Sequence, residues 1–406
     1  MNRCLGALPL LVALPLTCTA QGVPVELVAK LTVSGDAGTH LLGSYVALDG
    51  DVAYAGAQLY DARLTNEGSG FLFDTATGAQ LDKLLAPVRK SHDRFGAGDL
   101  DGDFVLIGAN GDDELGQSAG AAYLFNTVSS GPPIKLYASD ADRGDSFGSV
   151  VAISQSVALV GAYNTRSGGS AYLFDAETGV EQTRLTPDDQ ESGDRFGDAV
   201  AIDRGIALVG AVGAGDRGDF SGAAYLFDVD TGLQLSKLTA PDGAIGDYFG
   251  HSVAIDGSVA LVGAWRDDDK GSAYLFDVET GNLLHKLQAF EPLLTQQFGW
   301  SVSISGGIAA VGAPDDFGSG NGTGAAYLFD VATGTQLAKV SPADGVSGDD
   351  FGRAVAISGS SLLVGSRSEE PGLGIGSAYL YRLVPEPASA LLAMLAVCGT
   401  LLGRRS

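Results

Sequence analysis

Short apolar runs separated by polar turns recur along most of the chain, and the stretch from Asp194 to Leu238 shows the pattern in full. Its apolar runs cover residues 199–202, 206–211, 223–227 and 233–238, and turn residues such as Asp203-Arg204-Gly205 stand between them. Runs of this length bounded by Gly and Asp are typical of β-strands joined by tight turns. The stretch therefore predicts one small antiparallel sheet of four strands.

The same unit is repeated along the chain with a period near 50 residues. Each copy has a Phe-Gly pair before its first run, a Gly-Ala pair in its second run and an aromatic third run. The Phe-Gly pairs are Phe95-Gly96, Phe147-Gly148, Phe196-Gly197, Phe249-Gly250, Phe298-Gly299 and Phe351-Gly352, with Leu42-Gly43 as a degenerate first copy. Period and strand count predict an all-β fold, a seven-bladed β-propeller with four antiparallel strands per blade.

The ends of the repeat region indicate how the ring closes. The seventh unit stops at Leu383 without a fourth strand, whereas Leu27–Thr32, before the first unit, has the pattern of that missing strand. We expect this N-terminal strand to complete the last blade beside Ala378–Leu383, because pairing there removes an exposed sheet edge. The propeller would then span residues 25–383.

Both chain ends differ in character from the repeats. Residues 1–20 have a basic start, an apolar run and small residues ending at Ala20, which predicts a cleaved signal peptide and therefore export. Residues 384–406 begin with Val384-Pro385-Glu386-Pro387, continue as an uncharged apolar segment over 388–403 and end in basic residues. All three cysteines lie in these end segments, so we expect no disulfide in the propeller.

The charge balance narrows the class of partner. The chain has 24 basic and 49 acidic residues, for a formal net charge of −25. Such a surface repels phosphate backbones, so we expect no nucleic-acid partner. It favours cations or basic proteins, or it simply keeps an exported protein soluble.

By these motifs, residues 25–383 resemble the FG-GAP repeat family, the propeller type of integrin α subunits. The resemblance implies a binding or adhesion role. The C-terminal segment resembles a PEP-CTERM sorting signal. That implies processing by an exosortase-type enzyme at a bacterial cell envelope, with membrane contact only through 388–403 and the protein either anchored or released.

Many repeats of that family carry a calcium loop between their first two strands, which most units here replace by a tight turn. The second unit alone keeps spaced carboxylates, at Asp99, Asp101 and Asp103, whose oxygens could hold calcium. Phe104 stands where such a loop needs Gly, and no carboxylate follows at its ninth place. We therefore expect an Asp-Gly hairpin turn there, with calcium as the alternative and no other cofactor.

No motif predicts catalysis. Residues 144–148 spell a nucleophile elbow, but an elbow needs a strand-to-helix turn and a strand follows here. The four histidines lack metal-ligand spacing. We therefore expect a protein that is not an enzyme.

Recognition is expected on one face of the ring. The loops after each second and fourth strand share that face and are acidic, and the residues after Phe-Gly and Gly-Ala differ between units. The alternative is that loop ends are merely unconstrained. The candidate ligand-binding residues are Tyr163, Asp198, His251, Trp265, Asp267, Asp268, Asp269, Trp300 and Arg353.

Three functions remain open. The first is an exported, monomeric, non-enzymatic scaffold for adhesion or an extracellular matrix, binding an extracellular protein or polysaccharide. The second is a carbohydrate-binding (exopolysaccharide-binding) propeller, in which Trp265, Trp300 and Tyr163 stack on sugar faces. The third is an envelope hydrolase or lyase, which the absence of a convergent base and nucleophile disfavours.

Overall fold

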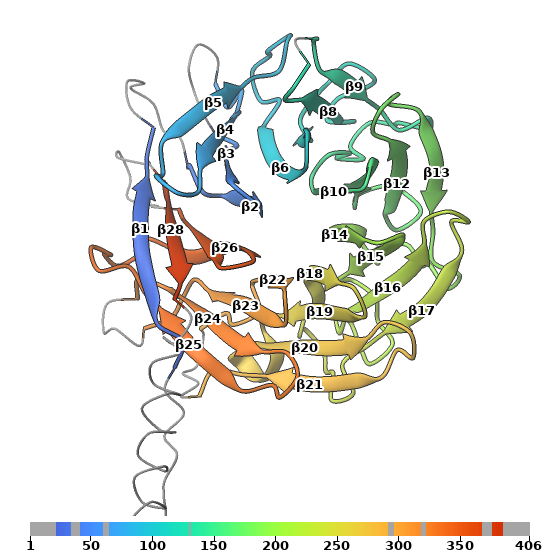
Figure 1. Cartoon of the computed structure of the whole chain (residues 1–406). Helices are drawn as coiled ribbons and strands as arrows, with labels where there is room; N and C mark the ends of the chain where they lie inside the picture. Colours follow the sequence, from blue (N-terminus) through green and yellow to red (C-terminus); the bar gives the residue numbers. More distant parts are fainter. Residues whose placement is uncertain are drawn as a thin grey trace, which may run out of the picture.

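A computed structural model shows a closed ring of seven four-stranded antiparallel sheets (Figure 1). It describes residues 22–33, 41–59, 65–129, 131–290, 296–317, 322–367 and 376–384. The predicted signal peptide (1–20) and nearly all of the predicted sorting signal lie outside these residues. The predicted fold class is confirmed.

Blades are numbered in chain order, and the first strand of each lines the centre. Blade 1 is β2 (Tyr45–Asp49), β3 (Val52–Ala57), β4 (Ser69–Asp74) and β5 (Gln80–Leu84). Blade 2 is β6 (Phe95–Asp101), β7 (Phe104–Ala109), β8 (Ala121–Asn126) and β9 (Ile134–Leu136). Blade 3 is β10 (Val151–Ser154), β11 (Val157–Ala162), β12 (Ser170–Asp175) and β13 (Glu181–Leu185).

The second half of the ring repeats the order. Blade 4 is β14 (Phe196–Asp203), β15 (Ile206–Ala211), β16 (Ala223–Asp228) and β17 (Gln234–Leu238). Blade 5 is β18 (Phe249–Asp256), β19 (Val259–Ala264), β20 (Ser272–Asp277) and β21 (Leu283–Leu287), with the 3-10 turn η1 (Asp267–Asp269). Blade 6 is β22 (Ser301–Ser305), β23 (Ile308–Ala313), β24 (Ala325–Asp330) and β25 (Gln336–Val340). Blade 7 is β26 (Phe351–Ser358), β27 (Ser361–Ser366), β28 (Ser377–Leu383) and β1 (Val25–Leu31).

The predicted closure is confirmed. Strand β1 pairs antiparallel with β28, from Val25 opposite Leu383 to Leu31 opposite Ala378, with a bulge after Leu27. In Figure 1 the blue N-terminal strand lies beside the red C-terminal one. Leu31 is buried in the joint with blade 1, and Lys30 forms an ion pair with Asp344 at 2.6 Å.

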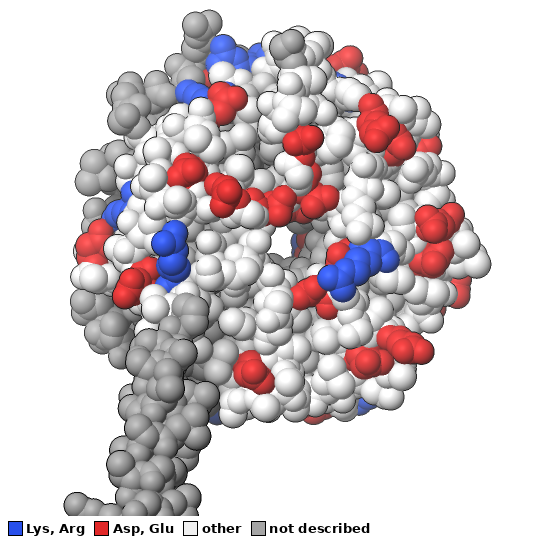
Figure 2. All heavy atoms as spheres, in the orientation of Figure 1, with Lys and Arg blue, Asp and Glu red and all other residues white. Residues whose placement is uncertain are grey.

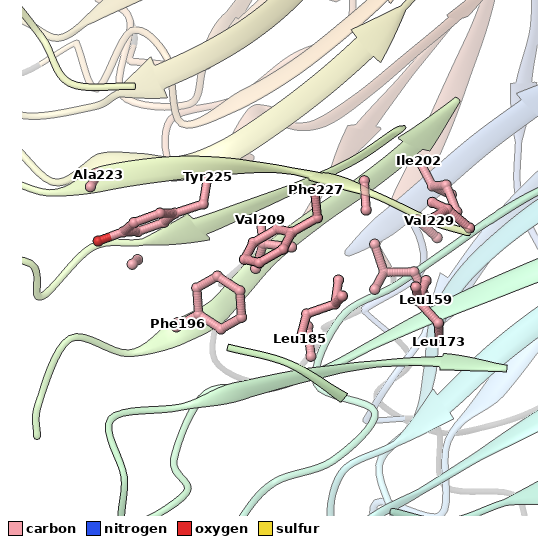
Figure 3. Close-up of a cluster of buried hydrophobic side chains, with 14 of the residues drawn as sticks. Leu159, Leu173, Leu185, Phe196, Ile202, Val209, Ala223, Tyr225, Phe227 and Val229 are labelled. Atoms are coloured by element: carbon pink, nitrogen blue, oxygen red, sulfur yellow. The ribbon is translucent and has the colours of Figure 1, made fainter. Parts of the chain in front are cut away.

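The hydrophobic core is divided among the joints between blades. Each of the seven joints holds one cluster of buried side chains contributed by two neighbouring blades. Between blades 3 and 4, Leu185 of blade 3 lies beside Phe196, whose ring meets that of Tyr225 edge to face at 5.7 Å (Figure 3). Edge-to-face pairs add to the stabilisation from burial. The aromatic third strands of the sequence are therefore the packing layer between blades.

The two glycine motifs meet at the same joints. Gly197 of a Phe-Gly pair has φ 89°, and a Cβ there would overlap the carbonyl oxygen of Ser170 in blade 3. A Cβ on Gly161 of the preceding Gly-Ala pair would overlap the carbonyl of Gly197. Only glycine permits this close backbone approach, which explains why both motifs recur in step.

Candidate functional site

A central channel of about 830 Å³ runs through the ring, and its two ends differ in chemistry. We call one end the turn face, because the hairpins between first and second strands lie there. We call the other the loop face; the residues on either side of Phe-Gly and the residue after Gly-Ala reach it. Figure 2 shows one face of the ring with the channel open at its centre and acidic side chains beside the opening.

Aromatic rings from blades 4, 5 and 6 gather at the loop-face mouth. The Trp265 and Trp300 rings are 5.1 Å apart, and the His251 ring is 4.6 Å from Trp300. The row continues outward through Tyr248, 5.3 Å from Trp265, to Phe220. We call these five residues the aromatic cluster. Three residues predicted from the sequence are thus brought into direct contact.

Arginine side chains flank the aromatic cluster. The guanidinium carbon of Arg353, from blade 7, lies 4.2 Å from the centre of the Trp300 ring. Arg195, from blade 4, lies over Tyr163 at 4.8 Å and forms an ion pair with Asp198 at 2.8 Å. Cations over aromatic faces are attracted to the ring quadrupole, so these contacts hold the guanidinium groups in place.

These neighbours perturb two titratable groups. Desolvation, assisted by the positive charges of Arg353 and Arg195, lowers the pKa of His251 to about 4. Burial raises the pKa of Asp198, and Arg195 partly opposes that effect. His251 is therefore neutral at pH 7, and the charge at this mouth comes from the arginines.

The residue before Phe-Gly has a left-handed backbone in every blade although it is never glycine. The seven residues, with φ between 43° and 59°, are Leu41, Arg94, Ser146, Arg195, Tyr248, Gln297 and Asp350. This conformation costs roughly 1 kcal/mol for a residue with a Cβ. The side chains of Arg195 and Tyr248 make contacts at the loop-face mouth that glycine would lack.

The predicted site residues are only partly assembled. Tyr163, Asp198, His251, Trp300 and Arg353 line the channel, and Trp265 contacts two of them through the aromatic cluster. In the acidic run Asp267–Asp269, the first residue makes contacts within the fold. Buried Asp267 pairs with Lys286 at 2.6 Å and accepts a hydrogen bond from Tyr274, whereas Asp268 and Asp269 are exposed.

The same ion pair is found in other blades, so some of the acidic residues in the loops after the second strands serve the fold. Buried Asp112 pairs with Lys135 and buried Asp316 with Lys339, each lysine lying over the tyrosine opposite it on the third strand. Carboxylates committed to a lysine and shielded from water are not free for a ligand. Of the acidic residues expected to bind a ligand, Asp267 is buried and paired with Lys286, which opposes that role, and ligand binding by Asp268 and Asp269 stays a prediction.

The carboxylates considered for calcium lie toward the turn face. Asp101 and Phe104 face each other across a two-residue hairpin, as expected. Asp99 accepts a hydrogen bond from the Ile153 amide at 2.9 Å, and Asp101 one from the Gln155 amide at 2.7 Å. Asp103 is exposed, and the described residues contain no group of three or more His, Cys, Asp or Glu side chains placed to hold a metal.

Asp101 belongs to a set of inter-blade ties. Asp49, Asp203 and Asp256 end the first strands of their blades, and each accepts a hydrogen bond from a glycine amide in the hairpin of the next blade, at 2.7–2.8 Å. Hydrogen bonds to a carboxylate are stronger than neutral ones. The acidic turn face is thus a means of joining blades.

Sequence reasoning missed several residues of the loop-face mouth. Tyr45, Arg94, Arg195 and Arg367 line the channel, and Tyr248 extends the aromatic cluster. A signal was present for three of them, because the position before Phe-Gly varies between units as much as the position after it. Tyr45 lies beside Leu42-Gly43, which replaces a Phe-Gly pair, and Arg367 follows Gly365-Ser366, which replaces a Gly-Ala pair. The altered motifs hide these two positions in the sequence.

A known family model matches the repeat region. The FG-GAP repeat model matches residues 79–125, 134–174, 180–227, 233–276, 285–329 and 335–381, together more than half of the chain. Each match starts near the outer strand of one blade and ends on the third strand of the next. A search of curated proteins finds no match. Separately, none of the described residues forms a helix long and apolar enough to cross a bilayer.

Proposed function

Because the chain belongs to the FG-GAP repeat family, we propose that it is an exported, non-enzymatic propeller that binds an extracellular protein or polysaccharide at its loop-face mouth. Its role would be adhesion or scaffolding at a bacterial surface or in a matrix. The observation that carries the proposal is the aromatic cluster with its flanking arginines. These side chains differ from blade to blade at positions where the backbone repeats.

The contrast between the two faces supports this choice of mouth. On the turn face, Asp228 accepts bonds from the amide and hydroxyl of Thr231, and the same turn recurs at Asp74, Asp175, Asp277 and Asp330. A repeated turn serves the fold, whereas a single asymmetric ligand needs side chains that break the pseudo-symmetry. The loop-face mouth has such side chains.

Binding is favoured over hydrolase or lyase chemistry by the state of His251. Its ring makes no hydrogen bond to any carboxylate or hydroxyl of the described chain, and its lowered pKa reflects burial beside arginines. A general base in a hydrolytic site is normally oriented by a hydrogen-bonding partner. Carbohydrate binding remains the second candidate, favoured by the two tryptophans at the mouth.

The test is a binding survey on glycan and extracellular-protein arrays, with and without calcium, using the wild-type chain and a Trp265→Ala/Trp300→Ala variant. Loss of the rings should weaken binding by roughly 1–3 kcal/mol per contacting ring, by analogy with base–aromatic stacking. A Leu235→Ala/Leu284→Ala variant, altered at exposed positions of outer strands, is the matched control and should bind normally. If the tryptophan variant stays folded and binds as well as wild type, this mouth is not the recognition site.

A further inference from the structure

The loop-face mouth is basic in a strongly acidic protein. Of the charged residues lining the channel at this end, four are arginines, Arg94, Arg195, Arg353 and Arg367, and one is a carboxylate, Asp198. The whole chain has a formal net charge of −25. At the other end the lining is acidic, with Asp49, Asp101, Asp203 and Asp256. Positive charge is therefore concentrated where the aromatic cluster lies.

Two arginines and one indole at this mouth have donor groups without an acceptor among the described residues. Arg94 is exposed and forms no ion pair with any described residue. Arg195 uses one terminal nitrogen on Asp198, but its Nε is buried without a hydrogen-bond partner in the described chain, and so is Nε1 of Trp265. Buried donors without acceptors cost folding free energy and are uncommon in native structures. The donors that a ligand oxygen can reach are the exposed guanidinium of Arg94 and the terminal nitrogen of Arg195 that Asp198 does not use.

The same mouth offers polar groups suited to hydroxyls. Asp198 stands beside Arg195, and the amides of Gln58 and Asn110 approach each other at 3.4 Å across blades 1 and 2. A carboxylate accepts hydrogen bonds from hydroxyls, whereas it repels a second carboxylate. The lining thus combines arginines, which bind negatively charged groups, with a carboxylate and amides that hydrogen-bond to neutral hydroxyl groups.

We infer that the loop-face mouth binds an acidic polysaccharide built of uronate-type sugars, whose carboxylates lie on the arginines and whose hydroxyls meet Asp198 and the amides. This inference rests on the proposed function and narrows its ligand. A uronate ring carries both a carboxylate and hydroxyls, which fits the mixed lining, whereas an acidic peptide would bring mainly carboxylates toward Asp198. The recessed position at the channel also admits the end of a linear chain more readily than a folded protein.

The test is calorimetric titration of the full chain with a galacturonate oligomer. The matched probes are a carboxyl-reduced, neutral oligomer of the same length and poly-aspartate of similar charge. The uronate oligomer should bind at least tenfold more tightly than either probe, and its affinity should fall as salt is raised because the attraction is ionic.

Two double variants locate the site. Arg94→Gln/Arg195→Gln should weaken uronate binding at least tenfold, while Arg166→Gln/Arg204→Gln, which removes two exposed charges elsewhere, should leave it within twofold. Arg195→Lys keeps the charge but not the planar fork, and should bind with intermediate affinity if the first variant is folded. Equal losses in both double variants would show a nonspecific charge effect and overturn the inference.

Failure of this inference differs from failure of the proposed function. If a neutral glycan or a protein binds and needs Trp265 and Trp300, the loop-face mouth is still the binding site and only the acidic ligand class is wrong. Tighter binding of poly-aspartate than of the uronate oligomer would likewise replace the polysaccharide by an acidic peptide. If the uronate oligomer binds but tolerates both the arginine and the tryptophan changes, both claims fall.

Discussion

Arg353 lies over the ring of Trp300 at 4.2 Å, and the two residues occupy the same repeat position in neighbouring blades. Each follows a Phe-Gly pair, where blades 2 and 3 have Ala97 and Ser149. The backbone of the repeat therefore points successive first-strand side chains at one another around the channel mouth. Variation at this position builds a composite site without changing the fold.

Ring closure can be tested at single residues of β1. Leu31 is 1% exposed and packs in the joint with blade 1, whereas Leu27 on the same strand is 52% exposed. Leu31→Ala should lower the free energy of unfolding by about 2–4 kcal/mol, as large-to-small core changes do. Leu27→Ala should change it by less than about 0.5 kcal/mol. Similar effects in chemical denaturation of the two variants would mean that β1 does not close the ring.

The need for glycine in Phe-Gly can be separated from its backbone conformation. Gly197 and Gly205 both have positive φ, but a Cβ on Gly197 would overlap backbone of blade 3 while one on Gly205 would meet open space. Gly205→Ala should cost about 1 kcal/mol through the left-handed backbone alone. Gly197→Ala should cost at least about 3 kcal/mol, measured as a fall in thermal stability. Equal losses would contradict the assigned close approach between blades.

The fold could be predicted from the sequence because the same strand pattern is repeated seven times, so uncertainty in any one strand matters little. One sheet of four short strands is a weak prediction, but seven copies in step with Phe-Gly and Gly-Ala leave few alternatives. The boundaries of the repeat also explain closure, since each matched repeat starts at or near the outer strand of one blade and ends on the third strand of the next. Strand β1 is therefore the ordinary start of a first, degenerate repeat.

The site was readable only in part. Positions that vary between repeats identified Trp300 and Arg353. Sequence alone could not show that Asp267 is buried and Asp268 exposed, because the two differ in their distance to Lys286, which is 2.6 Å for Asp267 and 4.0 Å for Asp268. The pairing of the third and fourth strands explains why Lys286 reaches Asp267. In five of the seven blades a lysine of the outer strand stands opposite a tyrosine of the third strand, as Lys286 does opposite Tyr274. From that position Lys286 reaches Asp267 in the loop.

Asp99 predicts a pH dependence of stability. Desolvation raises its pKa to about 6 from an ordinary value of 3.8, so the folded chain holds a proton that the unfolded chain releases. Its contribution to stability is complete below pH 4 and is lost as pH rises through 6. Relative to wild type, Asp99→Asn should gain on the order of 1–2 kcal/mol between pH 4 and pH 8, less than a dry site would give because channel water screens the charge.

The measurement is denaturant unfolding of both proteins across that pH range. Asp103→Asn removes an exposed carboxylate from the adjacent hairpin and controls for the loss of one charge. A stability difference between Asp99→Asn and wild type that stays flat with pH would contradict the raised pKa of Asp99.

His251 provides a second titration, of opposite sign. With its pKa near 4 in the fold and near 6.5 when unfolded, the folded chain binds fewer protons between these values, so this group weakens the fold as pH falls through that window. Proton NMR of the ring should give a pKa far below 6.5, and Arg353→Gln should raise it by removing a nearby positive charge. A wild-type value at or above 6.5 would mean that the ring is not enclosed beside arginines.

The chain contains only two tryptophans, and both lie in the aromatic cluster. Their fluorescence therefore reports on the loop-face mouth alone. The most direct test of recognition there is a fluorescence titration of the wild-type chain with the macromolecule that binds most tightly on the arrays. We predict a saturable change in tryptophan emission, together with protection from a collisional quencher, at the concentration where binding occurs. Saturating binding with unchanged emission and unchanged quenching would place recognition elsewhere on the ring.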